Sequence, residues 1–336
     1  MDDPTSGAVV DPAVGAAVDA GSNSVHLLVA RHGPGGLAPL RDESVLLGLG
    51  DVVDRDGQIP PAVQAQLAAA LGRYVELARS LGAAQVSLVA TEPLRRAANG
   101  WAVAAAVARL VGEPLHVLSE RQEGELTYLG VTGGWAVTSD SAGGPAPSAQ
   151  PLLVVDIGGG SSEVILAEPL ERPVVTSVPS GSARLSVGIV EHDPPTADEL
   201  DKLLGAAHAL VADLAGARPA RAIFVGGTAT NLARIAPLSR DGLKLAYRAL
   251  AELTAAQLSE RFGVNLRRAR QLPAGAAIVD ALLAHFGLDE AQVSQASLRE
   301  GAIIARARLG EDWPARLADL VARPDLGEWP AVADPV

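Results

Sequence analysis

The feature that most constrains the fold of this chain is a stretch that occurs twice. The segment "AVDAGSNSVHLLVA" at 17–30 can be laid without a gap over "VVDIGGGSSEVILA" at 154–167. The apolar run that ends one copy then coincides with the apolar run of the other. Because one sequence pattern is used twice, the chain is predicted to contain one structural device in duplicate. The coinciding polar and glycine positions are Asp19 with Asp156, Gly21 with Gly158, and Ser24 with Ser161.

Each copy is predicted to be a β-hairpin with an acidic, glycine-containing turn. Apolar and β-branched runs flank the turn on both sides, and no capped helix follows. A dinucleotide-binding fingerprint would need a glycine where Glu163 stands, and a Walker loop would need a Gly-Lys pair. The serines of the second copy are also not the centre of a G-x-S-x-G nucleophile elbow. The predicted loops therefore differ from the strand-to-helix loops of Rossmann and Walker folds.

The second turn contains three consecutive glycines followed by two serines. Glycine exposes bare backbone amides, and amides and hydroxyls are hydrogen-bond donors. An anion is therefore the expected guest, and a flexible hairpin turn is the alternative interpretation. The residues concerned are Gly158, Gly159, Gly160, Ser161 and Ser162.

Length and composition limit the classes of protein that this chain can be. With 336 residues, of which 48% are hydrophobic, it can form two domains with separate cores. The absence of cysteine excludes disulfides, thiolate zinc sites and thiol catalysis, and favours a cytoplasmic setting. The acidic N-terminus lacks the basic flank of a secretory signal, and no run of about 18 apolar residues predicts a membrane span.

The formal net charge of −12 opposes nonspecific binding to nucleic acid or to an anionic membrane. It also opposes a phosphate-rich ligand. Such a ligand would require local positive charge at the site, supplied by metal ions, backbone amides and selected arginines.

Strands alternate with helices in both halves of the chain, so the predicted fold class is α/β. The first domain is expected over 14–132 and the second over 152–309, each opened by one hairpin, with the two domains facing each other across a cleft. The stretch 133–151 is rich in glycine, proline and serine and is predicted to be a linker. A helix near 310–322 is expected to pack back on the first domain. Helices are predicted at 60–81, 101–111, 120–130 and 273–286.

Eight segments, in order over 16–309, resemble the exopolyphosphatase and guanosine pentaphosphate phosphohydrolase family, within the actin-like ATPase superfamily. They are "AAVDAGSNSVHLLVAR", "VATEPLRRAAN", "LSERQEGELTYLGV", "VVDIGGGSSEVILAE", "VPSGSARL", "FVGGTATNLA", "LPAGAAIVDALL" and "VSQASLREGAI". The resemblance implies two actin-like (ribonuclease H-like) domains facing a central cleft, and often a homodimer. It also implies hydrolysis, dependent on Mg²⁺ or Mn²⁺, of the terminal phosphoanhydride of inorganic polyphosphate or of guanosine pentaphosphate. An actin-like or sugar-kinase ATPase and a sensor that only binds these ligands are the alternatives.

The resemblance also implies two catalytic residues. In "SERQEGEL", Glu123 takes the position of the general base that activates water, and its neighbours Glu120 and Glu125 are the alternatives. In "VATEPLRRAAN", Arg95 would grip the transferring phosphoryl group, while Arg96 is expected to be its solvated neighbour. Without the resemblance, each of these side chains would be interpreted as a surface residue.

The same resemblance implies the ligands of a metal ion and of the phosphates. Asp156 and Glu163 would hold Mg²⁺, and Asp19 would either bind metal or orient the first loop. His26 is expected to be packed rather than catalytic, and the run "RRAR" at 267–270 is interpreted as a solvated helix face rather than a guide for a polyanion. The implied phosphate-binding residues are Gly21, Ser22, Asn23 and Ser24, then Gly158, Gly159, Gly160, Ser161 and Ser162, then Gly227 and Thr228 beside Gly226.

Overall fold

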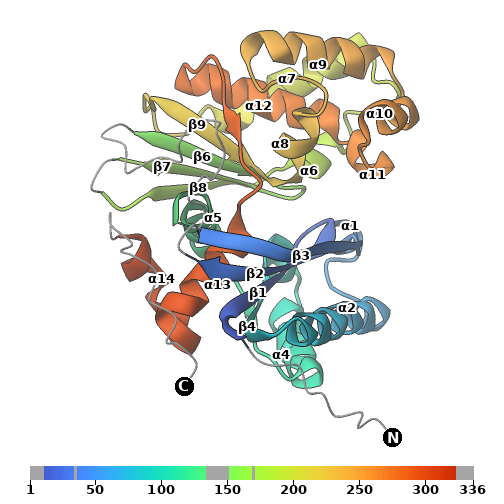
Figure 1. The fold of residues 1–336 in the computed structure, drawn as a ribbon. Helices are drawn as coiled ribbons and strands as arrows, with labels where there is room; N and C mark the ends of the chain where they lie inside the picture. Colours follow the sequence, from blue (N-terminus) through green and yellow to red (C-terminus); the bar gives the residue numbers. More distant parts are fainter. Residues whose placement is uncertain (1–10, 34–35, 134–150, 169–170, 323–336) are drawn as a thin grey trace, which may run out of the picture. The chain divides into compact units, whose positions relative to one another are not determined.

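A computed structural model describes residues 11–33, 36–133, 151–168 and 171–322. It divides into two compact units, and each contains one five-stranded sheet with helices on it (Figure 1). The duplicated α/β architecture predicted from the repeat is thereby confirmed. The predicted linker at 133–151 lies almost wholly outside the described residues.

The first unit has the strand order β3-β2-β1-β4-β5. Strand β1 pairs antiparallel with β2 and parallel with β4, and β4 pairs parallel with β5. Its elements are β1 (Asp11–Ala20), β2 (Ser24–Gly33), β3 (Gly36–Leu46), α1 (Leu49–Asp56), α2 (Pro61–Ser80), β4 (Ala83–Ala90), α3 (Glu92–Arg96), α4 (Gly100–Val111), β5 (Leu115–Val117), α5 (Glu120–Gly133), α13 (Leu298–Leu309), a 3-10 turn (Gly310–Asp312) and α14 (Trp313–Val321).

The second unit repeats this order as β8-β7-β6-β9-β10. Strand β6 pairs antiparallel with β7 and parallel with β9, as β1 does with β2 and β4. Its elements are β6 (Leu152–Ile157), β7 (Ser162–Ala167), β8 (Val174–Val178), α6 (Ser182–Ser186), α7 (Ala197–Val211), β9 (Arg221–Val225), α8 (Gly226–Leu232), α9 (Arg240–Glu252), α10 (Ala255–Phe262), α11 (Leu266–Ala269), α12 (Leu272–Phe286) and β10 (Gln292–Val293).

The two hairpins share one register. Asp19 lies opposite His26 across the first hairpin, and Asp156 lies opposite Glu163 across the second. An equivalent backbone hydrogen bond closes each of the two turns. The Gly21 amide donates to the Ser24 carbonyl at 3.0 Å, and the Gly158 amide donates to the Ser161 carbonyl at 3.0 Å. The sequence repeat is therefore a repeat of backbone geometry.

Helices cover both faces of the first sheet. On one face, Leu71 of α2 and Val103 of α4 are buried in one core with residues of β1, β2 and β4. On the other face α5, α13 and α14 form a second core around Trp313, which is fully buried. Figure 1 shows α13, late in the chain, beside the blue strands β1 and β2, with α14 next to α13 and α5.

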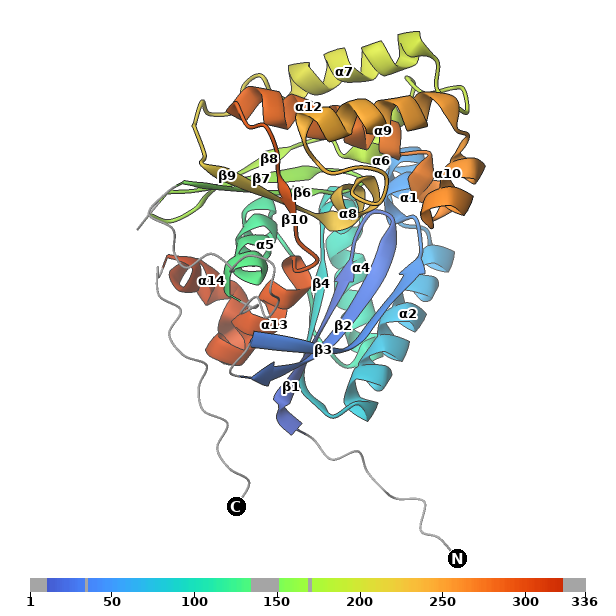
Figure 2. The ribbon, with the colours of Figure 1, turned by 45° about the horizontal axis from the view of Figure 1, so that its top comes forward.

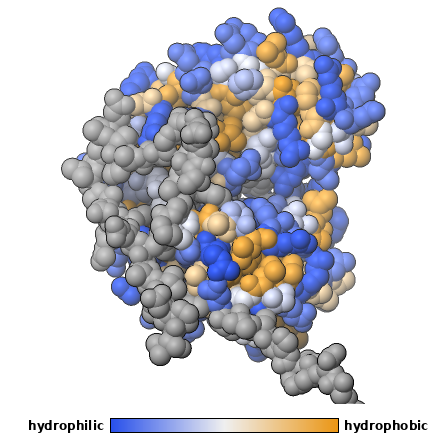
Figure 3. All heavy atoms as spheres, in the orientation of Figure 1, coloured by the Kyte–Doolittle hydropathy of each residue, from blue (hydrophilic) through white to orange (hydrophobic). Residues whose placement is uncertain are grey.

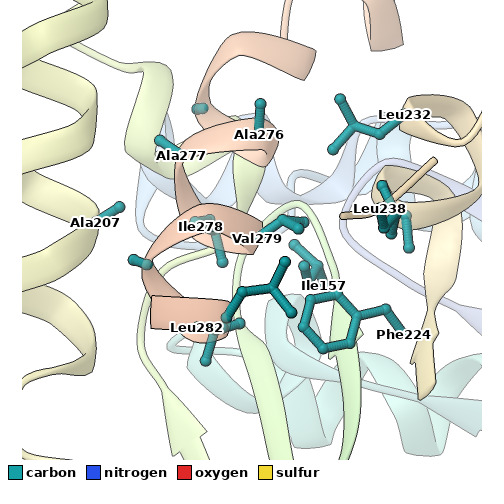
Figure 4. Close-up of a cluster of buried hydrophobic side chains, with 14 of the residues drawn as sticks. Ile157, Ala207, Phe224, Leu232, Leu238, Ala276, Ala277, Ile278, Val279 and Leu282 are labelled. Atoms are coloured by element: carbon teal, nitrogen blue, oxygen red, sulfur yellow. The ribbon is translucent and has the colours of Figure 1, made fainter. Parts of the chain in front are cut away.

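The core of the second unit lies between its sheet and helices α7 and α12. Figure 4 shows Ile278, Val279 and Leu282 of α12 directed toward Phe224 of β9 and Ile157 of β6. Small side chains let the layers approach closely, because α12 faces α7 through alanines such as Ala277 and Ala207. In Figure 2, α12 and α7 form successive layers on one side of the strands.

Helix α13 departs from the predicted domain boundary. The sequence analysis assigned 298–309 to the second domain, whereas α13 packs on α5 and β1 of the first unit. The physical reason is its apolar face, since Leu298, Ile303 and Ile304 join the core beneath β1 and β2. The chain therefore crosses from the second unit to the first between Ser297 and Leu298.

The larger exposed apolar side chains of the described residues are spread over several elements. Leu46 lies on β3, Trp101 and Leu110 on α4, Val174 on β8 and Leu245 on α9. Figure 3 shows apolar and hydrophilic residues interspersed on the face that it draws. Scattered apolar residues of this kind are normal on a protein surface. No helix among the described residues combines the length and the apolarity needed to span a bilayer.

The crossing of α13 over α5 gives a stability prediction. A Cβ added to Gly301 would lie 1.9 Å from the Leu126 carbonyl oxygen, so Gly301→Ala must push the two helices apart. We expect the free energy of unfolding to fall by about 1–3 kcal/mol in a denaturant titration. Gly72→Ala in α2 is the matched control, since nothing lies within 4 Å of its added Cβ. It should raise the free energy of unfolding by about 0.5–1 kcal/mol, and equal effects of the two variants would contradict this packing.

Candidate active site

The predicted catalytic segments of the first unit gather at one edge of its sheet. Strands β1, β4 and β5 run parallel, so their carboxyl ends meet there. The Thr91 amide after β4 donates to the Ala20 carbonyl of β1 at 3.3 Å, and the Leu118 amide after β5 donates to the Ala90 carbonyl of β4 at 2.9 Å. In α/β sheets this edge is the usual place for ligands.

Arg95 and Glu123 form an ion pair at this edge. Arg95 Nη1 lies 3.0 Å from Glu123 Oε2, and the side chains are 20% and 11% exposed. The same Nη1 donates to the Leu118 carbonyl at 2.8 Å, which anchors the guanidinium to the end of β5. Arg95 Nη2 is buried and finds no acceptor among the described residues. A buried donor of this kind suits an oxygen of a bound anion.

The first turn of α5 sets the position of Glu123. Ser119 and Gln122 form a capping box, because Gln122 Oε1 accepts from the Ser119 amide at 3.0 Å and Ser119 Oγ accepts from the Gln122 amide at 3.2 Å. Gln122 Nε2 also donates to the Pro314 carbonyl of α14 at 3.0 Å. Helix α14 therefore supports the turn that carries the candidate base.

The two alternatives to Glu123 have different surroundings. Glu120 is exposed. Glu125 has a side chain only 2% exposed and is paired with Arg121 at 2.8 Å. Of the three glutamates, Glu123 is the one paired with Arg95.

The first hairpin turn is held by the segment that follows β3. The Ser22 carbonyl accepts from the Gly50 amide at 2.9 Å, and the Asn23 carbonyl accepts from the Leu47 and Gly48 amides at 3.1 and 3.0 Å. Ser22 Oγ donates to Glu92 Oε2 at 3.2 Å. The Ser22 and Asn23 carbonyl oxygens thus accept hydrogen bonds from backbone amides of the protein.

Glu92 joins this turn to the arginine that follows Arg95. Arg96 Nε donates to Glu92 Oε1 at 2.5 Å, and the Arg96 guanidinium also pairs with Asp54 at 2.6 Å. Arg96 is exposed, as the sequence predicts, and its side chain, 37% exposed, also belongs to this network.

The second hairpin turn is held in the same way. The Gly158 carbonyl accepts from the Ser182 amide at 2.9 Å, and the Gly159 carbonyl accepts from the Ala183 and Arg184 amides at 3.1 and 3.0 Å. Ser182 Oγ lies 3.0 Å from Thr228 Oγ1, which ties the turn to α8. Gly159 is the repeat position of Ser22, so the two units stabilise their turns alike.

Asp156 and Glu163 are the candidate metal ligands of the second unit. They are cross-strand partners, so their side chains lie on one face of the sheet about 5 Å apart at Cβ. Glu163 is 2% exposed, and its Oε1 accepts from Ser177 Oγ at 3.2 Å. Gly226, at φ 84°, would place a Cβ 2.4 Å from Asp156 Oδ1, so only glycine fits the turn that covers this carboxylate.

This donor set fits Mg²⁺. No group of three or more His, Asp or Glu side chains suited to a metal occurs among the described residues. Magnesium is commonly held by one or two carboxylates, with water and substrate phosphates completing the shell. Two carboxylates beside the predicted phosphate-binding turn match that chemistry.

The position of Arg268 differs from the prediction. The sequence predicts a solvated helix face for the run 267–270, yet a Cβ on Gly227 would lie 1.4 Å from Arg268 Nη1. The guanidinium therefore lies against the glycine residues that begin α8, and burial lowers the pKa of Arg268. Arg270 is exposed, in agreement with the original interpretation.

The predicted site residues fall into two sets. Asp19, the turn 21–24, Arg95 and Glu123 belong to the first unit, and Asp156, the turn 158–162, Glu163, Gly227 and Thr228 belong to the second. Their joint action on one ligand stays a prediction. Sequence reasoning missed Glu92, Ser177, Ser182, Arg268 and Arg299. Arg299 Nη1 donates to the Leu27 carbonyl of β2 at 3.2 Å and to Asp42 Oδ1 at 2.7 Å. Ser177 was missed because the ungapped comparison ends at Ala167, the last residue of β7, before β8 begins.

Two units of one topology, each opened by an acidic-glycine hairpin, define an α/β protein of the actin-like fold. The sequence model of the Ppx/GppA phosphatase family matches residues 28–308. The chain belongs to this family, and its enzyme class is that of a phosphoanhydride hydrolase.

Similar proteins agree with this assignment. Exopolyphosphatase 1 of Mycobacterium leprae is 30% identical over 312 residues, which cover 86% of this chain and 88% of that protein. Exopolyphosphatase 2 of Mycobacterium tuberculosis is 30% identical over 330 residues, covering 87% and 98%. The crystal structure of the Aquifex aeolicus Ppx/GppA family member has a TM-score of 0.75 at 26% identity, covering 89% of this chain and 98% of that one. The predicted actin-like fold is confirmed.

The spare donor of Arg95 generates a prediction. Arg95→Ala removes the anion-binding guanidinium and the partner of Glu123, so the turnover number for a phosphoanhydride should fall by about 10²-fold or more. Arg95→Lys keeps the positive charge but loses the planar guanidinium, so its turnover number should lie between those of the parent and of Arg95→Ala. Orthophosphate release measures the effect, with the exposed Arg109→Ala as control. If a folded Arg95→Ala variant kept the turnover number of the parent, Arg95 would have no part in catalysis.

Proposed function

We propose that this protein is an exopolyphosphatase that hydrolyses the terminal phosphoanhydride of inorganic polyphosphate and releases orthophosphate. The observation that carries the proposal is the Arg95–Glu123 pair, in which a candidate base lies 3.0 Å from a guanidinium with a spare buried donor. Two relatives at 30% identity are exopolyphosphatases by name, which supports the same substrate class.

In the proposed reaction a water attacks the terminal phosphorus while Glu123 accepts its proton. The bond between that phosphorus and its bridging oxygen breaks, so orthophosphate leaves and the shortened chain keeps the bridging oxygen. Arg95 would donate from Nη2 to a nonbridging oxygen of the transferring group, whose charge is spread over three oxygens. The turns 21–24 and 158–162 would bind further phosphate oxygens through their amides and hydroxyls.

Asp156 and Glu163 would hold Mg²⁺ or Mn²⁺ in this proposal. When bound, the ion offsets the negative charge of the phosphate oxygens, which matters for a chain of net charge −12. The protein's own part is to present two carboxylates on one face of the sheet, with Ser177 and Gly226 fixing their positions.

Guanosine pentaphosphate is the alternative substrate, because it presents a terminal phosphoanhydride to the same groups. Orthophosphate release from long polyphosphate, short polyphosphate, guanosine pentaphosphate and ATP, measured side by side, tests the proposal. The highest kcat/KM is expected for polyphosphate. A preference for guanosine pentaphosphate or ATP would replace the proposed substrate, and binding of polyphosphate without turnover would make the protein a sensor.

The role of Glu123 is tested by Glu123→Gln. The amide keeps the size and a hydrogen bond to Arg95 but cannot accept the proton, so turnover should fall by about 10² to 10⁴-fold with substrate affinity largely kept. Steady-state kinetics and equilibrium binding of polyphosphate separate these two effects.

Glu120→Gln is the matched control for this experiment, because Glu120 lies on the same helix and is exposed. It should retain parental turnover. Glu125 is a poor control, since its side chain is buried in an ion pair with Arg121 and its replacement would also affect stability. If Glu120→Gln were inactive and Glu123→Gln active, the assignment of the base would be wrong.

Metal removal gives a further prediction. Without a cation, Asp156 and Glu163 place two negative charges beside a polyanion, so exhaustive chelation should abolish turnover and added Mg²⁺ or Mn²⁺ should restore it. Circular dichroism before and after chelation distinguishes loss of the ion from unfolding. Full turnover in the chelated protein would refute the metal requirement.

A further inference from the structure

The hydroxyl of Ser22 in the first hairpin turn donates to a carboxylate of the protein. Ser22 Oγ donates to Glu92 Oε2 at 3.2 Å, and the Glu92 side chain is only 9% exposed. A serine hydroxyl carries one hydrogen, and an ionised carboxylate can only accept. The hydrogen of Ser22 is therefore directed to Glu92, and only the lone pairs of the Ser22 oxygen remain for a further partner.

The other oxygen of this carboxylate is held by an arginine. Arg96 Nε donates to Glu92 Oε1 at 2.5 Å, and Arg96 Nη2 pairs with Asp54 Oδ1 at 2.6 Å. Guanidinium nitrogens are donors only, so the atom of Glu92 that faces Arg96 has to be an acceptor. Glu92 thus lies between a cation at one oxygen and a hydroxyl at the other, and both of these partners donate to it.

These contacts form a closed ring that includes helix α1. The Gly50 amide in the first turn of α1 donates to the Ser22 carbonyl at 2.9 Å. A Cβ added to Gly50 would lie 3.0 Å from Ser22 Cβ, so α1 lies directly against the hairpin turn. Asp54, one helical turn further along α1, pairs with Arg96. The backbone of Ser22 is therefore held by α1 and its side chain by Glu92, and loss of the contact with Glu92 would open the ring.

The ring places a negative charge beside a turn that is predicted to bind an anion. Helix α3 begins with Glu92 after β4, whereas α8 of the second unit begins with Gly226 and Gly227 after β9. The guanidinium of Arg268 lies against Gly227, so the second unit has a cation where the first has a carboxylate. An amide in place of the carboxylate could also bond both Arg96 and Ser22. What the carboxylate adds is its charge and the direction of the Ser22 hydrogen.

We propose that Glu92 is a positioning residue that limits the affinity of the first hairpin turn for phosphate. Because Glu92 takes the hydrogen of Ser22, this hydroxyl does not donate to a phosphate oxygen, and the charge of Glu92 repels the anion. The turn then binds phosphate through its other donors. The inference rests on the proposed function for its class of ligand, and it gives that function a means of product release, since a shortened polyphosphate is still a polyanion.

The experiment measures binding of methylenediphosphonate, a diphosphate analogue that resists hydrolysis, to the full chain by calorimetry in the presence of Mg²⁺. In Glu92→Gln, Arg96 holds the oxygen of the new amide, so the amide nitrogen donates to Ser22 and frees the hydroxyl hydrogen for the ligand. The dissociation constant should fall by about 3- to 10-fold, and the KM for polyphosphate should fall with it. A residue that only maintained the shape of the turn would give weaker binding on substitution.

Glu113→Gln is the matched control. Glu113 belongs to the same unit and also pairs with an arginine, Arg79, at 2.6 Å. Arg79 donates to the carbonyl of Ala83, where β4 begins, so this pair lies at the opposite end of β4 from Glu92. The dissociation constant of Glu113→Gln should stay within about 2-fold of the parental value. Equal tightening in the two variants would reveal an effect of net charge alone and would overturn the inference.

Ser22→Ala tests the direction of the hydroxyl. It should weaken binding by about 3-fold more in the Glu92→Gln background than in the parent, because only there is the hydrogen free to reach the ligand. Equal effects in the two backgrounds would overturn the inference. So would unchanged or weaker binding in a Glu92→Gln variant that thermal unfolding shows to be folded, or no binding of methylenediphosphonate by the parent.

Arg96 supplies a second pair of variants that keeps the test decisive if Glu92→Gln does not fold. Arg96→Gln removes the charge that offsets Glu92 and should weaken binding by about 3-fold or more, and Arg96→Lys should recover part of that loss. Parental binding in Arg96→Gln would overturn the inference. Since binding is measured without turnover, a protein that releases no orthophosphate from polyphosphate but shows this pattern would refute the proposed function and leave the inference standing.

Discussion

The hydrogen bond that closes each hairpin turn is the constraint on which the rest of the site depends. Gly21 and Gly158 each donate an amide to a serine carbonyl three residues later, at 3.0 Å in both cases. Asp19 and Asp156, two residues before these glycines, lie in strands β1 and β6. Each turn follows at the carboxyl end of its strand. The next segment then takes up the turn carbonyls, through Gly50 in one unit and Ala183 in the other. Each turn is therefore oriented from two sides before any ligand binds, which reduces the ordering cost of binding.

The catalytic edge of the first unit depends on chain segments that are distant in sequence. Arg95 follows β4, Glu123 begins α5, and the capping box of α5 is bonded to Pro314 of α14. Helix α13 crosses α5 so closely that Gly301 lies against the Leu126 backbone. The end of the chain thus supports the helix of the candidate base, and the packing of α13 and α14 is part of the geometry of the site.

The two hairpins share a backbone but differ in side-chain chemistry. Backbone register is shared, since Asp19 faces His26 as Asp156 faces Glu163. Side-chain chemistry is not shared, because a histidine replaces a carboxylate and Arg299 reaches the first sheet. The two hairpins therefore combine a common backbone with different charges.

Much of the local structure could be predicted from the sequence. The hairpins, the helix at 60–81, which forms as Pro61–Ser80, and the helix at 273–286, which forms as Leu272–Phe286, follow from periodicity and from glycine and proline signals. The prominence of Glu123 and Arg95 came from a resemblance, since one glutamate on a helix carries no signal of its own. Local patterns could identify these elements because hydrogen bonding within a turn or helix involves residues close in sequence.

The tertiary structure alone decided which unit receives α13, which arginine of the run 267–270 lies against Gly227, and which strands Arg299 contacts. An apolar helix face matches any apolar surface, so the assignment of α13 depended on the surface that α5 and β1 leave open. Arg268 and Arg270 are alike in sequence, and only the position of Gly227 separates them. The sequence by itself determined a duplicated α/β chain with two acidic turns. The hydrogen bond from Arg299 to the Leu27 carbonyl required the fold, because α13 and β2 are far apart in the sequence and meet only in the packed first unit.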